Sequence, residues 1–336
     1  MAIVGTVYGG TQSKWGFAEE ATFGTAIADD QNFVQFEGPI PTVDYGIVRD
    51  KEMKFNGSRV LAGAEKFYTD DGGIRQINFS DLIVRRIDLA PLIYGVFQNV
   101  TEGAETPYTK TFVIDNTTTQ PDFADDAGYF ATLGIYDPIA SYRRKFTSCI
   151  LSSLTLTADL AGDGRLKASG TWISGFSAST TANFSGTWAY NAQNYYNYHA
   201  MSKKQIEDTD VVVYGWDVTI TNNAVRVGGD TSGNAETYAL PMYDITGNIQ
   251  VKYDTAVQGL IADSIAGTGR EIDLAVGTGG SAGHFSMLLY DVYFDDIAKN
   301  YDEPRGHAIT VPFQARNLTS SDLALFTISD ANDFAW

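Results

Sequence analysis

Apolar and polar side chains alternate strictly along two segments of this sequence, residues 211–221 and 153–160. Alternation with a period of two is typical of β-strands that bury one face and expose the other. The turn sequence AGDG at 161–164 then leads into RLKASGTWIS, which predicts a hairpin over residues 152–174. We therefore expect a mostly β protein. The apolar positions expected to share a buried face are Val212, Tyr214, Trp216, Val218 and Ile220 in one segment and Leu154, Leu156, Ala158 and Leu160 in the other.

Two other segments have the spacing of a helix instead. Apolar residues recur at helical intervals over 89–97 and again over 257–265. Asp88 is the expected cap of the first helix, and Asp254 and Gly267 are the expected cap and stop of the second. Each helix follows a predicted strand, so we expect one short flanking helix in each half of the chain. The helical positions are Leu89, Leu92, Ile93, Val96 and Phe97, then Val257, Leu260, Ile261 and Ile265.

The recurrence of strand and helix indicates an internal repeat. The first helix aligns with the second when Ile77 and Ile83 are placed on Ile245 and Val251. The segments 33–38 and 211–216 also align, as do GYF at 128–130 and GHF at 283–285. We expect two tandem β domains, residues 1–176 and 202–336. Residues 177–201, rich in Ser, Thr, Asn and aromatic residues, are the expected linker, which docks on something because exposed aromatic residues at that density are unfavourable.

Each predicted domain carries a long connection before the strand that leads to its helix. These connections are residues 45–73 and 223–243. Connections of that length in compact domains are usually hairpin arms or binding loops. We expect both arms to have destinations in adjacent subunits.

Composition argues against several classes of partner. The chain has 41 acidic and 23 basic residues, a formal net charge of -18, so an average surface repels phosphate and anionic lipid. Tight nucleic-acid binding is therefore not expected, and no stretch has the length and apolarity of a membrane helix. The N-terminus lacks a basic segment followed by a long apolar run, so it does not have the pattern of a secretion signal. A single cysteine allows no intrachain disulfide, which fits synthesis and folding in a reducing cytoplasm.

Sequence signals for catalysis are weak. Cys149 is the single cysteine, and the histidines His199, His284 and His307 have no short metal-ligand spacing. No GxSxG nucleophile elbow occurs, and the glycine run at 277–283 lacks the lysine of a phosphate-binding loop and fits a hairpin better. We expect no enzyme activity, no cofactor and no metal.

The N-terminal run WGFAEEATFGTA, residues 15–26, followed by an FVQF strand, resembles the start of major tail tube proteins of long-tailed (siphovirus-like) bacteriophages. A Gly-Phe-x-Glu-Glu-x-x-Phe/Tyr-Gly-Thr-Ala run is typical of that family. The order of the later elements is similar as well, including the strand and helix at 72–97 and the hairpin at 152–174. Only the N-terminal run is a specific motif; the remaining similarity, spread over most of the chain, is one of element order.

The resemblance implies β-sandwich or partly closed barrel domains, each with a flanking helix. It further implies rings that stack into the hollow tube of a phage tail, through which double-stranded DNA passes transiently during ejection. A chain with two such domains would close as a homotrimeric, pseudo-hexameric ring. The other partners would be phage tail proteins at the ends of the tube, and the location would be the virion.

Candidate subunit-contact residues lie in the N-terminal run and in the first arm. The carboxylates of the run would await a partner, and its aromatic side chains would act as anchors at a subunit contact. These candidates are Trp15, Phe17, Glu19, Glu20 and Phe23, then Met53, Phe55, Arg59, Phe67 and Tyr68.

Two other functions fit the same composition. A β-rich carbohydrate-binding or glycoside-active protein would stack sugars on its Tyr- and Trp-rich surface and remain a monomer. A capsid-decorating or adhesive protein would also be acidic and β-rich, and it would form trimers that do not polymerise.

Overall fold

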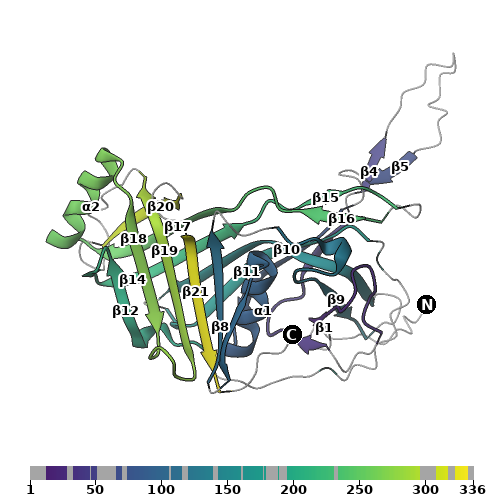
Figure 1. The fold of residues 1–336 in the computed structure, drawn as a ribbon, viewed down its shortest axis with the longest axis horizontal. Helices are drawn as coiled ribbons and strands as arrows, with labels where there is room; N and C mark the ends of the chain where they lie inside the picture. The colour runs from purple at the N-terminus through teal and green to yellow at the C-terminus, as the bar shows by residue number, and fades with distance from the viewer. Residues whose placement is uncertain are drawn as a thin grey trace, which may run out of the picture.

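The computed structural model confirms a mostly β protein, with two α-helices in the part of the chain that it describes (Figure 1). No helix among these residues is long and apolar enough to cross a membrane. The described residues are 13–28, 33–45, 47–50, 66–69, 74–105, 107–115, 120–138, 143–159, 162–176, 178, 188, 195–230, 234–295, 308–316 and 322–331.

The first half of the chain forms an antiparallel series of strands in the order β3, β6, β11, β10, β9, β1. The predicted hairpin over 152–174 is confirmed as β10 and β11. The elements of this half are β1 (Lys14–Glu19), β2 (Val34–Gln35), β3 (Thr42–Asp44), β4 (Ile47–Asp50), β5 (Lys66–Thr69), β6 (Arg75–Ile83), α1 (Arg86–Phe97), β7 (Thr101–Glu105), β8 (Tyr108–Asp115), the 3-10 turn η4 (Phe123–Asp125), β9 (Ala131–Tyr136), β10 (Arg144–Asp159) and β11 (Leu166–Ser174).

The second half contains a series with the same connections, β14, β17, β20, β19, β18, β12. In both halves a two-stranded hairpin lies between the first and second strands of the series, and a helix follows the second. The elements are η6 (Tyr198–Ala200), β12 (Met201–Ile206), β13 (Thr209–Asp210), β14 (Val213–Thr221), β15 (Val225–Val227), β16 (Thr237–Ala239), β17 (Asp244–Lys252), α2 (Thr255–Ala266), β18 (Arg270–Val276), β19 (His284–Phe294), β20 (Ala308–Ala315) and β21 (Asp322–Asp330).

Strand pairing joins the two halves directly. β10 pairs with β14 from Ser153↔Thr221 to Asp159↔Gly215, and β8 pairs with β21. One apolar core contains side chains of both halves. The segment expected as a linker contributes to the interior as well, because Trp188 stacks on Phe33 with ring centroids 5.2 Å apart.

The ladders give a residue correspondence between the halves that differs from the sequence alignment. Ile77 pairs with Trp172 and Gly247 pairs with Phe313, which puts Ile77 at the position of Gly247 rather than of Ile245. The segments GYF and GHF do not correspond either, since the first precedes β9 and the second begins β19, the counterpart of β10. Periodicity could not fix this register because single-residue bulges shift it.

Two such bulges also change which side chains are buried. Asp81 in β6 has a positive φ of 52°, so Leu82 and not Ile83 returns to the buried face. A register shift between Val213 and Gly215 leaves Val212 46% exposed, although alternation placed it on the buried face.

The helices begin and end close to the predicted positions. Asp88 is not the cap of α1 but its third residue, and it accepts a hydrogen bond from the backbone N–H of the actual cap, Arg85. In α2, the side chain of Asp254 accepts from Val257 N at 3.3 Å as predicted, and Gly267 follows the helix with a φ of 63°. α1 is buried against β10, β8 and β21, whereas α2 lies at the periphery (Figure 1).

Candidate functional site

The N-terminal run forms β1, which lies between β2 and β9 in the interior of the subunit. Trp15 and Phe17 are each 1% exposed, and both rings pack on Phe36, with centroids 4.5 and 5.0 Å away. Gly16 is required by close packing, because a Cβ there would lie 2.1 Å from the carbonyl oxygen of Val34. Trp15 and Phe17 therefore have a core role in this chain and offer no free surface to a neighbour, contrary to the anchor interpretation.

The carboxylate of Glu20 also has its partners within the chain. It accepts hydrogen bonds from Thr132 Oγ1 at 2.5 Å, from Ser148 N at 2.8 Å and from Ser148 Oγ at 2.6 Å. Burial raises the pKa of Glu20, and these hydrogen bonds oppose that shift. Glu20 thus ties β1 to β9 and β10 and does not await an external partner. Glu19 is half-buried, and desolvation raises its pKa while Lys110 lowers it.

Phe23 belongs to an aromatic cluster that includes the second predicted arm. Its ring lies 5.5 Å from Phe130, 5.3 Å from Phe176 and 5.6 Å from Tyr238. Tyr238 comes from β16, so the hairpin β15–β16 folds back over the first half of its own chain. The expectation that the arm at 223–243 leaves for an adjacent subunit is therefore wrong, because its apolar side chains complete a cluster inside this chain.

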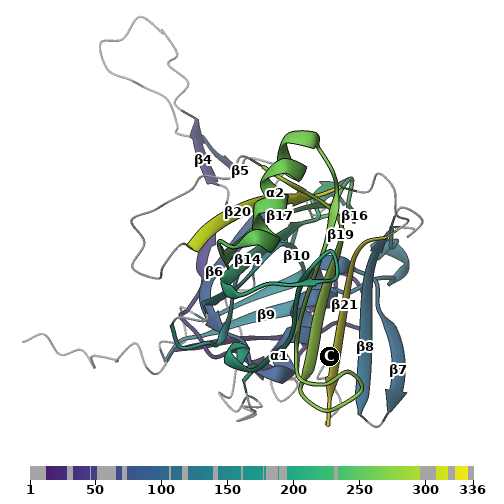
Figure 2. The ribbon, with the colours of Figure 1, turned by 90° about the vertical axis from the view of Figure 1, so that its left-hand side faces the viewer.

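The first predicted arm contains the hairpin β4–β5, which pairs from Ile47↔Thr69 to Asp50↔Lys66. It stands out from the body of strands in both views (Figures 1 and 2). Phe67 and Tyr68 lie in β5, whereas Met53, Phe55 and Arg59 lie outside the described residues. A subunit-contact role for these five residues stays a prediction, as it does for Glu19 and Phe23.

A broad polar face covers the side of the sheet away from the core, across β6, β11, β10, β14, β17 and β20. Its side chains bond across the strands, with Thr155 and Thr219 oxygens 2.9 Å apart and Asn248 Nδ2 donating to Asp217 at 3.1 Å. Burial raises the pKa of Asp217, which the bonds from Asn248 oppose. The face is mostly Ser, Thr, Asn and Gln, and its charged members include Lys167, Lys252, Asp159, Asp217 and Asp244.

The repeated Ser, Thr, Asn and Gln at outward strand positions could have revealed this face from sequence. The alternation that identifies the buried side chains also places Thr155, Thr219 and Thr221 on the opposite side. Its extent across both halves could not be predicted, because it depends on the pairing of β10 with β14.

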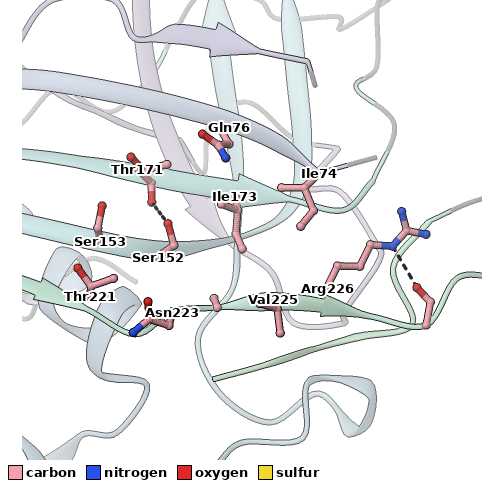
Figure 3. A pocket seen from close by; sticks show the side chains of 12 residues that line it. Ile74, Gln76, Ser152, Ser153, Thr171, Ile173, Thr221, Asn223, Val225 and Arg226 are labelled. Atoms are coloured by element: carbon pink, nitrogen blue, oxygen red, sulfur yellow. Dashed lines mark hydrogen bonds between the residues drawn. The ribbon is translucent and has the colours of Figure 1, made fainter. Parts of the chain in front are cut away.

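A cavity of about 830 Å³ lies at one end of the polar face, beneath the base of the arm β15–β16 (Figure 3). Ser152, Ser153 and Thr171 line one side, and Asn223 and Arg226 line the other. The guanidinium of Arg226 donates to the carbonyl oxygens of Gly228 and Asn234 and so holds the arm itself. The cavity is lined by no aromatic ring, histidine or carboxylate among the described residues, which leaves it without a sugar-stacking platform or a general acid–base pair.

Other reactive groups in the described part of the chain are structural or isolated. Cys149 is buried, and burial raises its pKa well above the ordinary value, so its thiol is not activated. No group of three or more His, Cys, Asp or Glu side chains positioned to hold a metal ion occurs among these residues.

No protein-family model matches this chain, and no curated protein matches it. The function is therefore inferred from the geometry together with the resemblance carried by residues 15–26.

Proposed function

We propose that this chain is a structural subunit of a phage tail tube, in which three copies close into a ring and the rings stack into a conduit for DNA. The observation that carries the proposal is the strand order β3, β6, β11, β10, β9, β1, which recurs as β14, β17, β20, β19, β18, β12. We interpret this recurrence as a tandem duplication of one tail-tube-type domain with its own helix and arm.

The joint between the two units supports a ring. β14 pairs with β17 on one side and with β10 of the first unit on the other. Its counterpart β3 pairs with β6, and no second strand partner occurs for it among the described residues. A strand from a neighbouring copy would therefore continue the sheet at β3 as β10 continues it at β14. Repetition of such a heterologous contact closes a ring, and three two-unit chains give six positions.

The polar face supports a channel lining. Hydroxyl and amide side chains keep this surface hydrated. Its lysines are few and lie among carboxylates, so they would neutralise few DNA phosphates and release few of the counterions that surround the DNA. DNA would slide along such a surface rather than bind it. The net charge of -18 acts in the same direction.

The described tryptophans argue against a sugar-binding surface. Trp15, Trp172, Trp188 and Trp216 are all buried, so they offer no exposed ring for stacking on a glycan. The virion tail would then be the location, and tail proteins at the ends of the tube would be the other partners.

Negative-stain electron microscopy of the concentrated protein tests the proposal. Rings or tubes with a central hole are expected. Particles that remain monomeric at every protein and salt concentration would contradict it, and trimers that never stack would favour a decorating role instead.

A further inference from the structure

Tyr238 in the docked arm β15–β16 occupies a specific backbone site on the first half of the chain. Its hydroxyl accepts a hydrogen bond from Gly175 N at 2.6 Å and donates one to the carbonyl oxygen of Ser148 at 3.0 Å. The ring packs among Phe23 and Phe123. A tyrosine hydroxyl can donate and accept at once, so it bridges an N–H and a C=O that would otherwise face each other.

The second half contains the corresponding backbone site, and no arm lies on it among the described residues. The bulge that places Ser148 before Cys149 recurs with Asp291 before Val292, and the adjoining ladders make Arg316 the counterpart of Gly175. Here Arg316 N donates directly to the carbonyl oxygen of Asp291 at 3.0 Å. In the second half, the counterparts of the two groups that Tyr238 bridges are thus hydrogen-bonded directly to each other.

We infer that this second-half site receives the hairpin β4–β5 of a second copy of the chain. β4–β5 lies between β3 and β6 as β15–β16 lies between β14 and β17. Tyr68 pairs with Val48 within the hairpin, and Tyr238 pairs with Arg226 in the corresponding place. Docking opens the direct hydrogen bond between Arg316 N and the carbonyl oxygen of Asp291, and the hydroxyl at position 68 then accepts from that N–H and donates to that carbonyl. The inference rests on the proposed function, because it uses the ring to bring the arm of one copy to the next.

The second-half site is more polar than the first-half site, and the hairpin β4–β5 is correspondingly more charged than β15–β16. Ile150 and Ile173 form the floor of the first-half site, and their ladder counterparts in the second half are Tyr293 and Gln314. Arg316 adds an exposed guanidinium there, which donates to Gln314 Oε1 at 2.8 Å. The hairpin sequences follow this difference, since IVRD and KFYT in β4 and β5 carry more charge than VRV and TYA in β15 and β16.

Photo-crosslinking of assembled protein tests the inference. A benzophenone amino acid replaces Tyr68, and a mixture of isotopically light and heavy copies distinguishes links between chains from links within one. The expected links join position 68 of one copy to residues 290–295 or 312–316 of another. The same probe at Thr157, on the polar face, is the control and is expected to give no link to these residues.

The outcomes separate this inference from the proposed function. Assembled rings whose links from position 68 map elsewhere, or only within one chain, would overturn the inference and leave the tube proposal intact. Failure of the unmodified protein to assemble under any condition would overturn both.

A matched pair of substitutions gives a second readout. Tyr68→Phe is expected to raise the protein concentration needed for assembly by roughly 2- to 12-fold, with the urea midpoint of the monomer unchanged. Tyr238→Phe should instead lower that midpoint, because its hydrogen bonds lie within one chain. An unchanged assembly threshold for Tyr68→Phe would count against the docking.

Discussion

Ser148 and Asp291 adopt the same left-handed backbone conformation, with φ of 46° and 45°, at the same bulge of equivalent strands. In each case four residues of the longer strand face three of its partner, Phe146 to Cys149 against β9 and Leu289 to Val292 against β18. Non-glycine residues seldom take this conformation, so its recurrence at matching positions is a sharp marker of the shared architecture. The bulge also fixes the register between the halves.

The Glu20 network that holds the first of these bulges predicts a pH-dependent stability. The pKa of Glu20 is raised in the fold, so the ionised carboxylate carries a cost that is present at neutral pH and disappears as the pH falls through the folded pKa. Glu20→Gln keeps the Oε1 acceptor for Thr132 Oγ1 and Ser148 N without that cost, and its Nε2 replaces the acceptor at Ser148 Oγ with a donor to that hydroxyl. The variant should be at least as stable as the parent at pH 7.

Urea unfolding at pH 7 and pH 5 measures this difference. As the pH is lowered, the free energy of unfolding of the parent should rise relative to that of Glu20→Gln. At pH 7, Glu20→Ala should be less stable than the parent by about 1–3 kcal/mol. A parent-to-Gln difference that does not change with pH would show that Glu20 is not destabilised by burial.

The buried ion pair at the start of α1 predicts a large effect of a small change. Arg85 Nη2 lies 2.7 Å from Asp88 Oδ1, and both side chains are fully buried. Asp88→Asn removes the charge that compensates the guanidinium and should lower the free energy of unfolding by about 3–5 kcal/mol. Asp263→Asn, which affects the more exposed pair with Arg270, should cost under about 1 kcal/mol. Equal losses for the two variants in urea titrations would refute this account of α1.

Gly247 predicts a packing limit in the centre of the second-half sheet. A Cβ there would lie 2.2 Å from the carbonyl oxygen of Asp217 and 2.7 Å from Cζ of Phe313. Gly247→Ala should therefore lower the free energy of unfolding by about 3 kcal/mol. Gly259→Ala in α2 meets no atom within 4 Å and should gain about 0.5–1 kcal/mol. Thermal unfolding of the two variants should shift in opposite directions, and a neutral Gly247→Ala would contradict the crowding.

The arm β4–β5 predicts a separation of folding from assembly. β3 and β6 pair directly with each other, from Thr42↔Asn78 to Asp44↔Gln76, without help from the hairpin between them. Deleting residues 50–70 should therefore leave the circular dichroism spectrum and the urea midpoint nearly unchanged while tubes no longer grow. Normal tubes from the deleted protein would remove the arm from the assembly mechanism.

Much of the local structure could be predicted from periodicity. Alternation gave the β10–β11 hairpin, and helical spacing gave both helices, because these features depend on residues close in the sequence. The burial of Phe17 differs from the anchor prediction for the opposite reason. An aromatic residue beside glycine fits a surface anchor as well as a core strand, and only the pairing of β1 with β2 and β9 decides between them. Replacing Phe17 with Ser is therefore expected to destabilise the fold itself.

The arms show a second limit of the sequence. The lengths of the connections predict both arms, but the destination of β15–β16 depends on Tyr238 meeting Phe23, which lies more than half of the chain away. No local pattern records such a contact. The register between the halves cannot be predicted from the alternation, because a single-residue bulge such as that at Asp81 leaves no signal in it.

Counting the chains in one ring tests the central claim most directly. Native mass spectrometry of disassembled tubes, together with cryo-electron microscopy of intact ones, gives the mass and the rotational symmetry of a ring. The account predicts three 36.6 kDa chains per ring, with threefold symmetry and six similar units around the channel. A ring of six chains, or a particle with no channel, would contradict it.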